Sequence, residues 1–318
     1  MTTRGIFADA SAPLPATPGT YGEAPTGFRL PPGTAPGLVR LQVADLERSL
    51  DYYQGTLGLL ARARDGESAM LGARGPAGDD ATPLVELREL RGAKRSPHQG
   101  RLGLFHFAIL LPDRPSLARF VLHLGELGIP AGQGDHLVSE AFYLTDPDGL
   151  GIEVYADRPR EAWRRKGREL MMTTDPLDLE GLVREAGGTP WTGIPDGSVM
   201  GHLHLHVGDL AAASRFYSEA LGFDRTVWSY PGALFLAAGG YHHHLGANVW
   251  AGPTARPPAD DAARLLEWTL DLPDAASLQA ATESLTGAGY SAELIDGAAP
   301  EVVTRDPWET TLRLRARA

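Results

Sequence analysis

The chain has 318 residues, 43% of them hydrophobic, which is enough for one large or two ordinary domains. Its formal net charge of −11 argues against a general nucleic-acid surface, and the lack of cysteine excludes disulfides, thiolate metal sites and cysteine nucleophiles. The sequence shows neither an apolar run of about 18 residues nor a secretory leader, so we expect a cytoplasmic protein without membrane partners.

The N-terminal segment 1–36 is rich in Pro, Thr, Gly and Ala and shows little periodicity. Such a composition favours either an extended arm or a poorly ordered tail. We assign it as an extended N-terminal arm and expect regular structure to begin at Gly37.

Four later segments share one plan of a strand, a helix and three further short strands. In the first, an alternating strand ends at Val43, Asp45 is placed to cap a helix, and Gly58 follows its end. The four helix-starting aspartates are Asp45, Asp113, Asp209 and Asp274. The four regions of short strands are 59–90, 130–156, 224–250 and 290–316. This repeat predicts an α+β fold of four βαβββ modules.

One such module leaves an open sheet with one apolar face, whereas two modules side by side close it around a cavity. We therefore expect two curved-sheet, half-barrel domains. Segment 159–198 is charged and carries a short helix flanked by proline, which is typical of a connector. It divides the chain into 37–158, with modules one and two, and 199–318, with modules three and four.

Four motifs stand out in the repeats: "LFHFAILLPDR", "DPDGLGIEVYADRP", "GHLHLHVGDL" and "GYHHHLGANVW". They resemble motifs of the vicinal oxygen chelate superfamily, which includes glyoxalase I, bleomycin and fosfomycin resistance proteins and extradiol ring-cleaving dioxygenases. The similarity extends over residues 37–316 and is greatest to dioxygenases of the catechol 2,3-dioxygenase type.

The resemblance implies one inward ligand position on the first strand of each module and another on the last strand. Seven residues before the helix-starting aspartates stand Leu38, His106, His202 and Glu267. Seven residues after the aspartate of a DP turn stand Glu153 in module two and Arg313 in module four, and Glu86 is near this position in module one.

His106, Glu153 and His202 therefore form a candidate metal site. A single histidine on an apolar strand is more often a core residue, but the joint occurrence at equivalent repeat positions favours ligands. Two histidines and one carboxylate leave open positions on Fe(II) for substrate and oxygen, with Mn(II) or another divalent metal as the alternative. His204 shares a strand face with His202 and is the alternative ligand; otherwise it lines the cavity.

This ligand set requires modules two and three to share one cavity, so modules one and four would form the half without metal. The commoner dioxygenase arrangement instead places the metal within the C-terminal pair of modules. The pairing of modules is therefore a specific structural prediction.

The resemblance also implies residues beyond the ligands. A histidine acid/base is expected in "GYHHHLG", and His243 matches the family pattern, with His244 as the alternative if a bulge changes its face. Tyr143, ten residues before Glu153, is expected to bind a substrate oxygen, and His136 resembles the histidine before it. The remaining expected cavity residues are Asn248 and Trp250.

These residues predict an Fe(II)-dependent extradiol dioxygenase that cleaves a catechol-like or hydroquinone-like ring with O2. Two other classes use the same scaffold: metal-dependent lyases, isomerases or transferases of the glyoxalase type, and non-catalytic drug-binding resistance proteins. Members often assemble, so a homo-oligomer is one expected state. The sequence does not identify the aromatic substrate.

Overall fold

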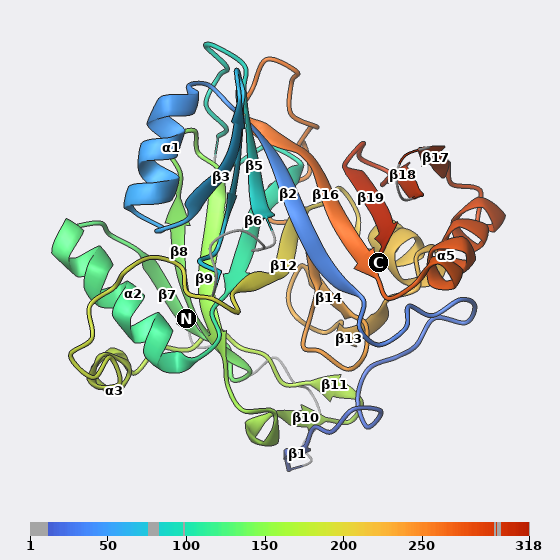
Figure 1. Cartoon of the computed structure of the whole chain (residues 1–318). Helices are drawn as coiled ribbons and strands as arrows, with labels where there is room; N and C mark the ends of the chain where they lie inside the picture. Colours follow the sequence, from blue (N-terminus) through green and yellow to red (C-terminus); the bar gives the residue numbers. More distant parts are fainter. Residues whose placement is uncertain (1–11, 76–82, 98, 296, 298–299, 318) are drawn as a thin grey trace.

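The computed structural model describes residues 12–75, 83–97, 99–295, 297 and 300–317. Within these ranges, the chain forms two eight-stranded sheets, one three-stranded sheet and a few helices (Figure 1). The prediction of an α+β fold with two half-barrel sheets is confirmed.

The four modules have the following elements. Module one comprises β2 Ala35–Val43, α1 Leu46–Gly55, β3 Leu60–Asp65, β4 Ser68–Gly72 and β5 Pro83–Glu89. Module two comprises β6 Gly103–Leu110, α2 Arg114–Leu127, β7 Gly132–Asp135, β8 Ser139–Thr145 and β9 Gly151–Asp157. Module three comprises β12 Val199–His206, α4 Leu210–Ala213, the π-helix η2 Ser214–Ala220, β13 Asp224–Val227, β14 Ala233–Ala237 and β15 Leu245–Asn248. Module four comprises β16 Arg264–Leu272, α5 Ala275–Gly287, β17 Glu293–Ile295, β18 Glu301–Arg305 and β19 Thr311–Ala316.

The sheets pair the modules as the ligand set required. One sheet has the order β13-β14-β15-β12-β6-β9-β8-β7 and joins modules three and two. The other has the order β17-β18-β19-β16-β2-β5-β4-β3 and joins modules four and one. Each of the segments 37–158 and 199–318 thus contributes one module to each sheet, so the division of the sequence at 159–198 is not a division between the sheets.

Helix capping follows the sequence pattern. The carboxylates of Asp45, Asp113, Asp209 and Asp274 each accept a hydrogen bond from the backbone N–H three residues on. Helix α1 ends at Gly55, and Gly58 lies beyond it with a φ of +79°. A Cβ at Gly58 would lie 2.5 Å from the Gly193 Cα atom, so glycine also permits this close approach.

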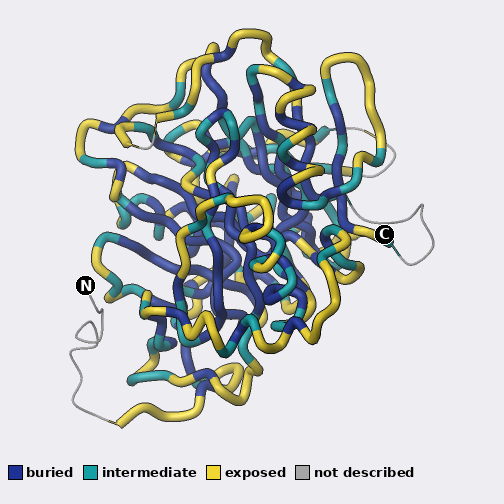
Figure 2. Tube along the Cα trace, turned by 90° about the vertical axis from the view of Figure 1, so that its left-hand side faces the viewer, coloured by how far each residue is buried: buried dark blue, intermediate teal, exposed yellow. Residues whose placement is uncertain are grey.

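The core lies along both sheets, where alternate strand residues are buried between sheet and helices. In β6 and β12, Phe107, Ile109, Leu203 and Leu205 belong to this core, whereas their histidine neighbours belong to the opposite face. Figure 2 shows the same pattern, with buried segments in the interior and exposed segments in the outer connections. The alternation is what directs the histidines of these two strands away from the apolar core.

The N-terminal arm and the connector pack together. Residues 1–11 lie outside the described residues, but the arm from residue 12 already has structure, before the expected start at Gly37. Its strand β1 (Leu14–Pro15) pairs with β10 (Arg164–Lys166), which pairs with β11 (Glu169–Leu170). The connector also forms the 3-10 helix η1 (Arg160–Ala162) and the short helix α3 (Leu179–Arg184). No helix within the described ranges is both long and apolar enough to span a membrane.

Candidate metal centre and active site

Strand register places the candidate ligands on one face of the sheet. His202 of β12 is opposite Ala108 of β6, which is opposite Glu153 of β9, and Glu153 is opposite Tyr143 of β8. His106 lies two residues before Ala108, on the same face. The methyl group of Ala108 leaves space between the longer side chains on either side of it, so these side chains can converge.

The three side chains do converge. His106 Nε2 lies 2.9 Å from Glu153 Oε2, and His202 Nε2 lies 3.1 Å from the same oxygen. One ligand atom from each residue lies within 4.8 Å of the others, and all three residues are buried. Among the described residues, no other group of three or more histidine or acidic side chains lies close enough together to hold a metal ion.

The donor set fits a metal ion better than a closed hydrogen-bond network. Two ligands at about 2.1 Å from one ion and at right angles lie about 3.0 Å apart, close to the N···O separations here. Although His106 Nε2 is near Glu153, it has no hydrogen-bond partner of acceptable geometry among the described residues, and it is buried. A buried imidazole nitrogen without a partner is costly, and a bound cation would satisfy it.

Burial and charge give the ligands the protonation states that a metal needs. Burial lowers the pKa of His202 to about 4, which keeps its imidazole neutral at neutral pH. Burial alone would raise the pKa of Glu153, but the His202 and His106 imidazoles outweigh it and hold that pKa well below its usual range. His202 therefore offers a neutral imidazole nitrogen and Glu153 an ionised carboxylate, the ligand forms that bind divalent metals.

A cavity of about 240 Å³ opens beside this group. Beyond the ligands, it is lined mainly by aromatic and other apolar side chains. They are Phe105, Tyr143, Met172, Tyr230, Phe235 and Trp250. The flat, apolar walls favour a planar aromatic guest over a strongly charged one.

Tyr143 and His136 form one hydrogen-bonded pair in the cavity. His136 Nδ1 donates to the Thr173 carbonyl at 2.6 Å, so its Nε2 accepts from the Tyr143 hydroxyl, also at 2.6 Å. Burial, with the nearby Glu153 carboxylate, raises the pKa of Tyr143 well above its usual value. Tyr143 therefore stays a phenol that donates its hydrogen to His136, and its oxygen can accept a hydrogen bond from a guest.

The structure separates the two candidate acid/base histidines. The segment His242–His244 lies between β14 and β15, and the His243 ring lines the cavity 4.1 Å from the His202 ring. Burial lowers the pKa of His243 well below its usual value. His244 does not line this cavity; it stacks on Tyr241, and its Nδ1 accepts from the Ala238 N–H at 3.1 Å. Of the two, His243 alone can meet a guest there.

The expected substrate-binding residues differ in whether they line the cavity. His204 and Trp250 line the cavity, with Trp250 43% exposed at its edge. Asn248 is fully buried and does not line it, because its Oδ1 is held by the His206 Nδ1–H and the Trp250 N–H. Asn248 thus differs from the expectation and supports the strand end instead.

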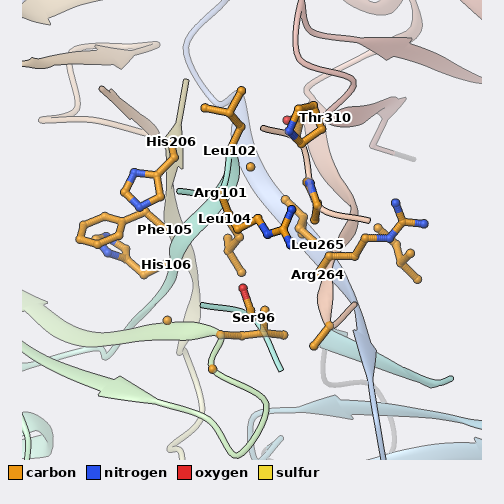
Figure 3. A pocket seen from close by; sticks show the side chains of 18 of the residues that line it. Ser96, Arg101, Leu102, Leu104, Phe105, His106, His206, Arg264, Leu265 and Thr310 are labelled. Atoms are coloured by element: carbon orange, nitrogen blue, oxygen red, sulfur yellow. The ribbon is translucent and has the colours of Figure 1, made fainter. Parts of the chain in front are cut away.

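A second cavity of about 660 Å³ lies between the two sheets. Figure 3 shows Phe105, His106 and His206 on one side of the view and Arg264, Leu265 and Thr310 on the other. Since His106 and Phe105 line both cavities, the larger cavity adjoins the candidate metal centre.

The equivalent positions in the other sheet hold ion pairs. Arg40 contacts both Glu86 and Glu267, and Arg313 Nε lies 2.8 Å from Glu267 Oε1. Leu38 contributes no ligand atom. Arginine side chains thus neutralise the carboxylates there. The described residues of this sheet show no group of histidine and acidic side chains that could hold a metal ion.

Sequence reasoning missed several residues of the site. Met172 and Thr173 reach the cavity from the connector, for which no sequence signal exists. Asp157, by contrast, shares a strand face with Glu153 at a spacing of four, and strand alternation could have indicated it. It contacts His242, the first histidine of the run.

The sequence is similar to that of known proteins throughout this region. A family model described as the Glyoxalase/Bleomycin resistance protein/Dioxygenase superfamily matches residues 36–154 and 199–297. The chain is 45% identical over 260 residues to a protein of Bacillus subtilis (strain 168) called catechol-2,3-dioxygenase, covering 81% of this chain and 89% of that protein.

Solved structures share the fold. A putative dioxygenase from Bacillus subtilis aligns with a TM-score of 0.62 at 15% identity, over 92% of this chain and 86% of that one. Glyoxalase I from Zea mays aligns with a TM-score of 0.55 at 18% identity, over 89% and 92% of the two chains. At these identities the likeness supports the fold alone.

Proposed function

Because the chain belongs to the glyoxalase/bleomycin resistance protein/dioxygenase superfamily, we propose that it is an extradiol dioxygenase acting on a catechol-like or hydroquinone-like aromatic. The observation that carries this proposal is the buried group of His106, Glu153 and His202, with an unpartnered His106 nitrogen, beside an aromatic-lined cavity. The 45% identity to a protein called catechol-2,3-dioxygenase supports it.

In this proposal His106, Glu153 and His202 hold the metal, with Fe(II) as the first choice and Mn(II) or another divalent ion as the alternative. When bound, Fe(II) would supply open coordination positions for substrate oxygens and O2, and electrons for their reaction. Since one carboxylate balances only one of its two positive charges, an ionised catechol oxygen would complete the neutralisation.

The protein's own residues handle the protons. His243 is neutral at working pH and lines the cavity next to His202, so it can take the proton of a substrate hydroxyl and return it to a product oxygen. Tyr143 remains protonated and donates to His136, so its oxygen can accept a hydrogen bond from a substrate hydroxyl and orient it.

The walls position the ring and limit water. Phe235 and Met172 are buried and face the cavity, and Trp250 stands at its edge. Such walls hold a planar ring by apolar contact and keep bulk water away from the reacting oxygens.

The decisive test loads the metal-free protein with Fe(II) anaerobically and then adds oxygen with catechol, substituted catechols or hydroquinone. We expect a yellow ring-fission product and uptake of one O2 for each ring cleaved. A matched control is His123→Asn, since this histidine of α2 lines neither cavity, and it should keep wild-type activity. Bound iron without ring cleavage on any of these substrates would refute the proposal.

The same preparation separates the two competing functions. A glyoxalase-type enzyme should prefer Ni(II), Zn(II) or Mn(II) and need no oxygen. A drug-binding protein should retain no metal after reconstitution and bind its ligand equally well in the variant His106→Ala.

A further inference from the structure

A chain of hydrogen bonds leads from the cavity to a carboxylate outside it. His243 Nδ1 and His242 Nδ1 are 2.7 Å apart, and His242 Nε2 lies 3.0 Å from Asp157 Oδ1. His242 is fully buried, whereas the Asp157 side chain is 27% exposed at the end of β9. Neither Asp157 nor His242 lines the metal cavity.

The order of donors and acceptors in this chain is fixed by its carboxylate end. An ionised carboxylate only accepts, so His242 Nε2 carries the hydrogen and donates it to Asp157. The other nitrogen of a neutral His242, Nδ1, is then an acceptor. His243 Nδ1 must therefore carry a hydrogen and donate it to His242, which leaves His243 Nε2 with its lone pair.

The surrounding structure holds the middle of this chain and its carboxylate end. The His242 backbone carbonyl accepts from the Thr226 hydroxyl at 2.7 Å, and the Asp157 Oδ1 atom also accepts from the Tyr241 hydroxyl at 3.2 Å. Gly239 and Gly240, with φ of +62° and +71°, make the turn before the histidine run. The loop can thus present three consecutive histidines in three different directions.

We propose that Asp157 and His242 are positioning residues that fix the ring orientation and tautomer of His243, so that its Nε2 atom faces a bound substrate as a proton acceptor. The catalytic consequence rests on the proposed dioxygenase function, but the tautomer does not. When His243 takes a substrate hydroxyl proton at Nε2, its Nδ1–H stays bonded to His242, so the ring is held in place while it is charged.

The tautomer can be read directly. In the full chain labelled with 15N-histidine and loaded with diamagnetic Zn(II), NMR should show His243 protonated at Nδ1 and unprotonated at Nε2. Its signals are identified by their loss in His243→Gln. In Asp157→Asn the amide N–H can donate to His242 Nε2, which reverses the direction of donation along the chain. His243 should then carry its hydrogen on Nε2 instead of Nδ1.

A matched pair of variants tests the positioning role in the iron-loaded enzyme. His242→Gln keeps an acceptor toward His243 and a donor toward Asp157, whereas His242→Leu keeps neither. We expect His242→Leu to lower kcat by roughly 10–100-fold with KM and iron content nearly unchanged, as is typical for residues that orient others, and His242→Gln to restore most of it.

The outcomes separate this inference from the proposed function. A His243 that is protonated at Nε2 in the wild type, or equal loss of kcat in His242→Gln and His242→Leu, would overturn the inference. The expected tautomer pattern in a protein that cleaves no catechol would overturn the proposed function and leave the positioning arrangement standing.

Discussion

Glu153 is a carboxylate buried in the sheet interior, where an isolated charge would be costly. Its nearest polar neighbours are two imidazoles, His106 and His202, and none of the three is more than 5% exposed. The carboxylate stays ionised because the imidazoles outweigh the effect of burial on its pKa. In the proposed function, this arrangement requires a divalent cation shared between the three groups.

Glu153→Gln tests that requirement. The amide keeps the size of the side chain but removes its charge, so affinity for a divalent metal should fall by more than the roughly 10–100-fold typical of residues that only support a ligand. Metal content after reconstitution and dialysis measures it. Glu126→Gln, on the exposed end of α2, is the control. Equal metal content in the two variants would argue against Glu153 as a ligand.

His244 makes a contribution to stability that depends on pH. Burial lowers its pKa to about 3, while in the unfolded chain it titrates near 6.5. Between these values the unfolded chain binds a proton that the native protein excludes. The contribution of His244 to the free energy of unfolding should therefore fall by about 1.4 kcal/mol per pH unit as the pH drops from 6.5 toward 3. Below about pH 3 it should no longer change.

His244→Asn removes this dependence while keeping an acceptor for the Ala238 N–H. Urea unfolding at several pH values should give a flatter curve for the variant than for the wild type, since the other histidines contribute equally to both. Parallel curves would contradict the assignment.

At the residue scale, repeat positions predicted more than residue types did. His106, Glu153 and His202 were grouped as candidate ligands because equivalent positions in four repeats could be compared, and the structure brings their side chains together. The sequence did not decide between His243 and His244 as the candidate acid/base, because the conformation of the loop between β14 and β15 determines which ring lines the cavity. Asn248 was misplaced, because a polar residue at the end of a strand can satisfy a neighbour as easily as a ligand.

Among the elements, β15 packs its Gly246 against the His204 ring of β12. His204 is opposite Gly246 in the parallel pair, and a Cβ at Gly246 would lie 2.8 Å from the His204 ring. The absence of a side chain there lets the ring of a cavity residue lie against the neighbouring strand.

Gly246→Ala should therefore cost about 1–3 kcal/mol in the free energy of unfolding, as overpacking does, and displace His204 in the cavity. Denaturant unfolding and the 15N-histidine spectrum measure the two effects. Gly125→Ala, in α2 with no neighbour near its added methyl group, should be neutral or stabilise by up to about 1 kcal/mol. A smaller loss in Gly246→Ala than in Gly125→Ala would contradict this account.

Element types and helix starts were predictable, because capping aspartates and strand alternation are local signals. The seven residues between β14 and β15 were not. Their conformation depends on two left-handed glycines and on hydrogen bonds to distant strands, including the one from Thr226 to the His242 carbonyl.

Across the whole molecule, the N-terminal arm supports the cavity from behind. Tyr21 packs in a separate apolar cluster that includes Met172 and Phe235, both of which line the cavity. Its hydroxyl donates to the Gly240 carbonyl at 2.6 Å, next to the histidine run. The arm, connector and module three therefore form one supporting unit.

Tyr21→Ala should destabilise the protein by about 3–5 kcal/mol and increase hydrogen exchange of residues 238–244. Tyr21→Phe removes only the hydrogen bond, and because the Arg160 side chain still donates to the Gly240 carbonyl it should cost about 0.5–1.5 kcal/mol. Unfolding experiments and hydrogen exchange measure both. Unchanged exchange in Tyr21→Ala would show that the arm does not support the histidine loop.

The pairing of modules was predictable from chemistry, since His106 and Glu153 needed a second histidine and only module three offered it at the repeat position. The role of the connector was not predictable, because Met172 and Thr173, which line the cavity, lie in a segment whose sequence has no periodic pattern. Cross-module contacts, such as those of the Tyr53 hydroxyl with Asp146 and the Tyr217 hydroxyl with Asp306, likewise appear only in three dimensions.

Modules one and four, the outer two in the sequence, pair with each other, and modules two and three, which lie between them, form the other pair. During synthesis the inner sheet has all its strands once residue 248 has emerged, whereas β2 must wait for β16, and β16 for β19. At typical synthesis rates the residues from 249 to 316 take roughly 3–14 s more. The nascent chain therefore can assemble the sheet with the candidate metal centre first, and the first module made is among the last to find its partner.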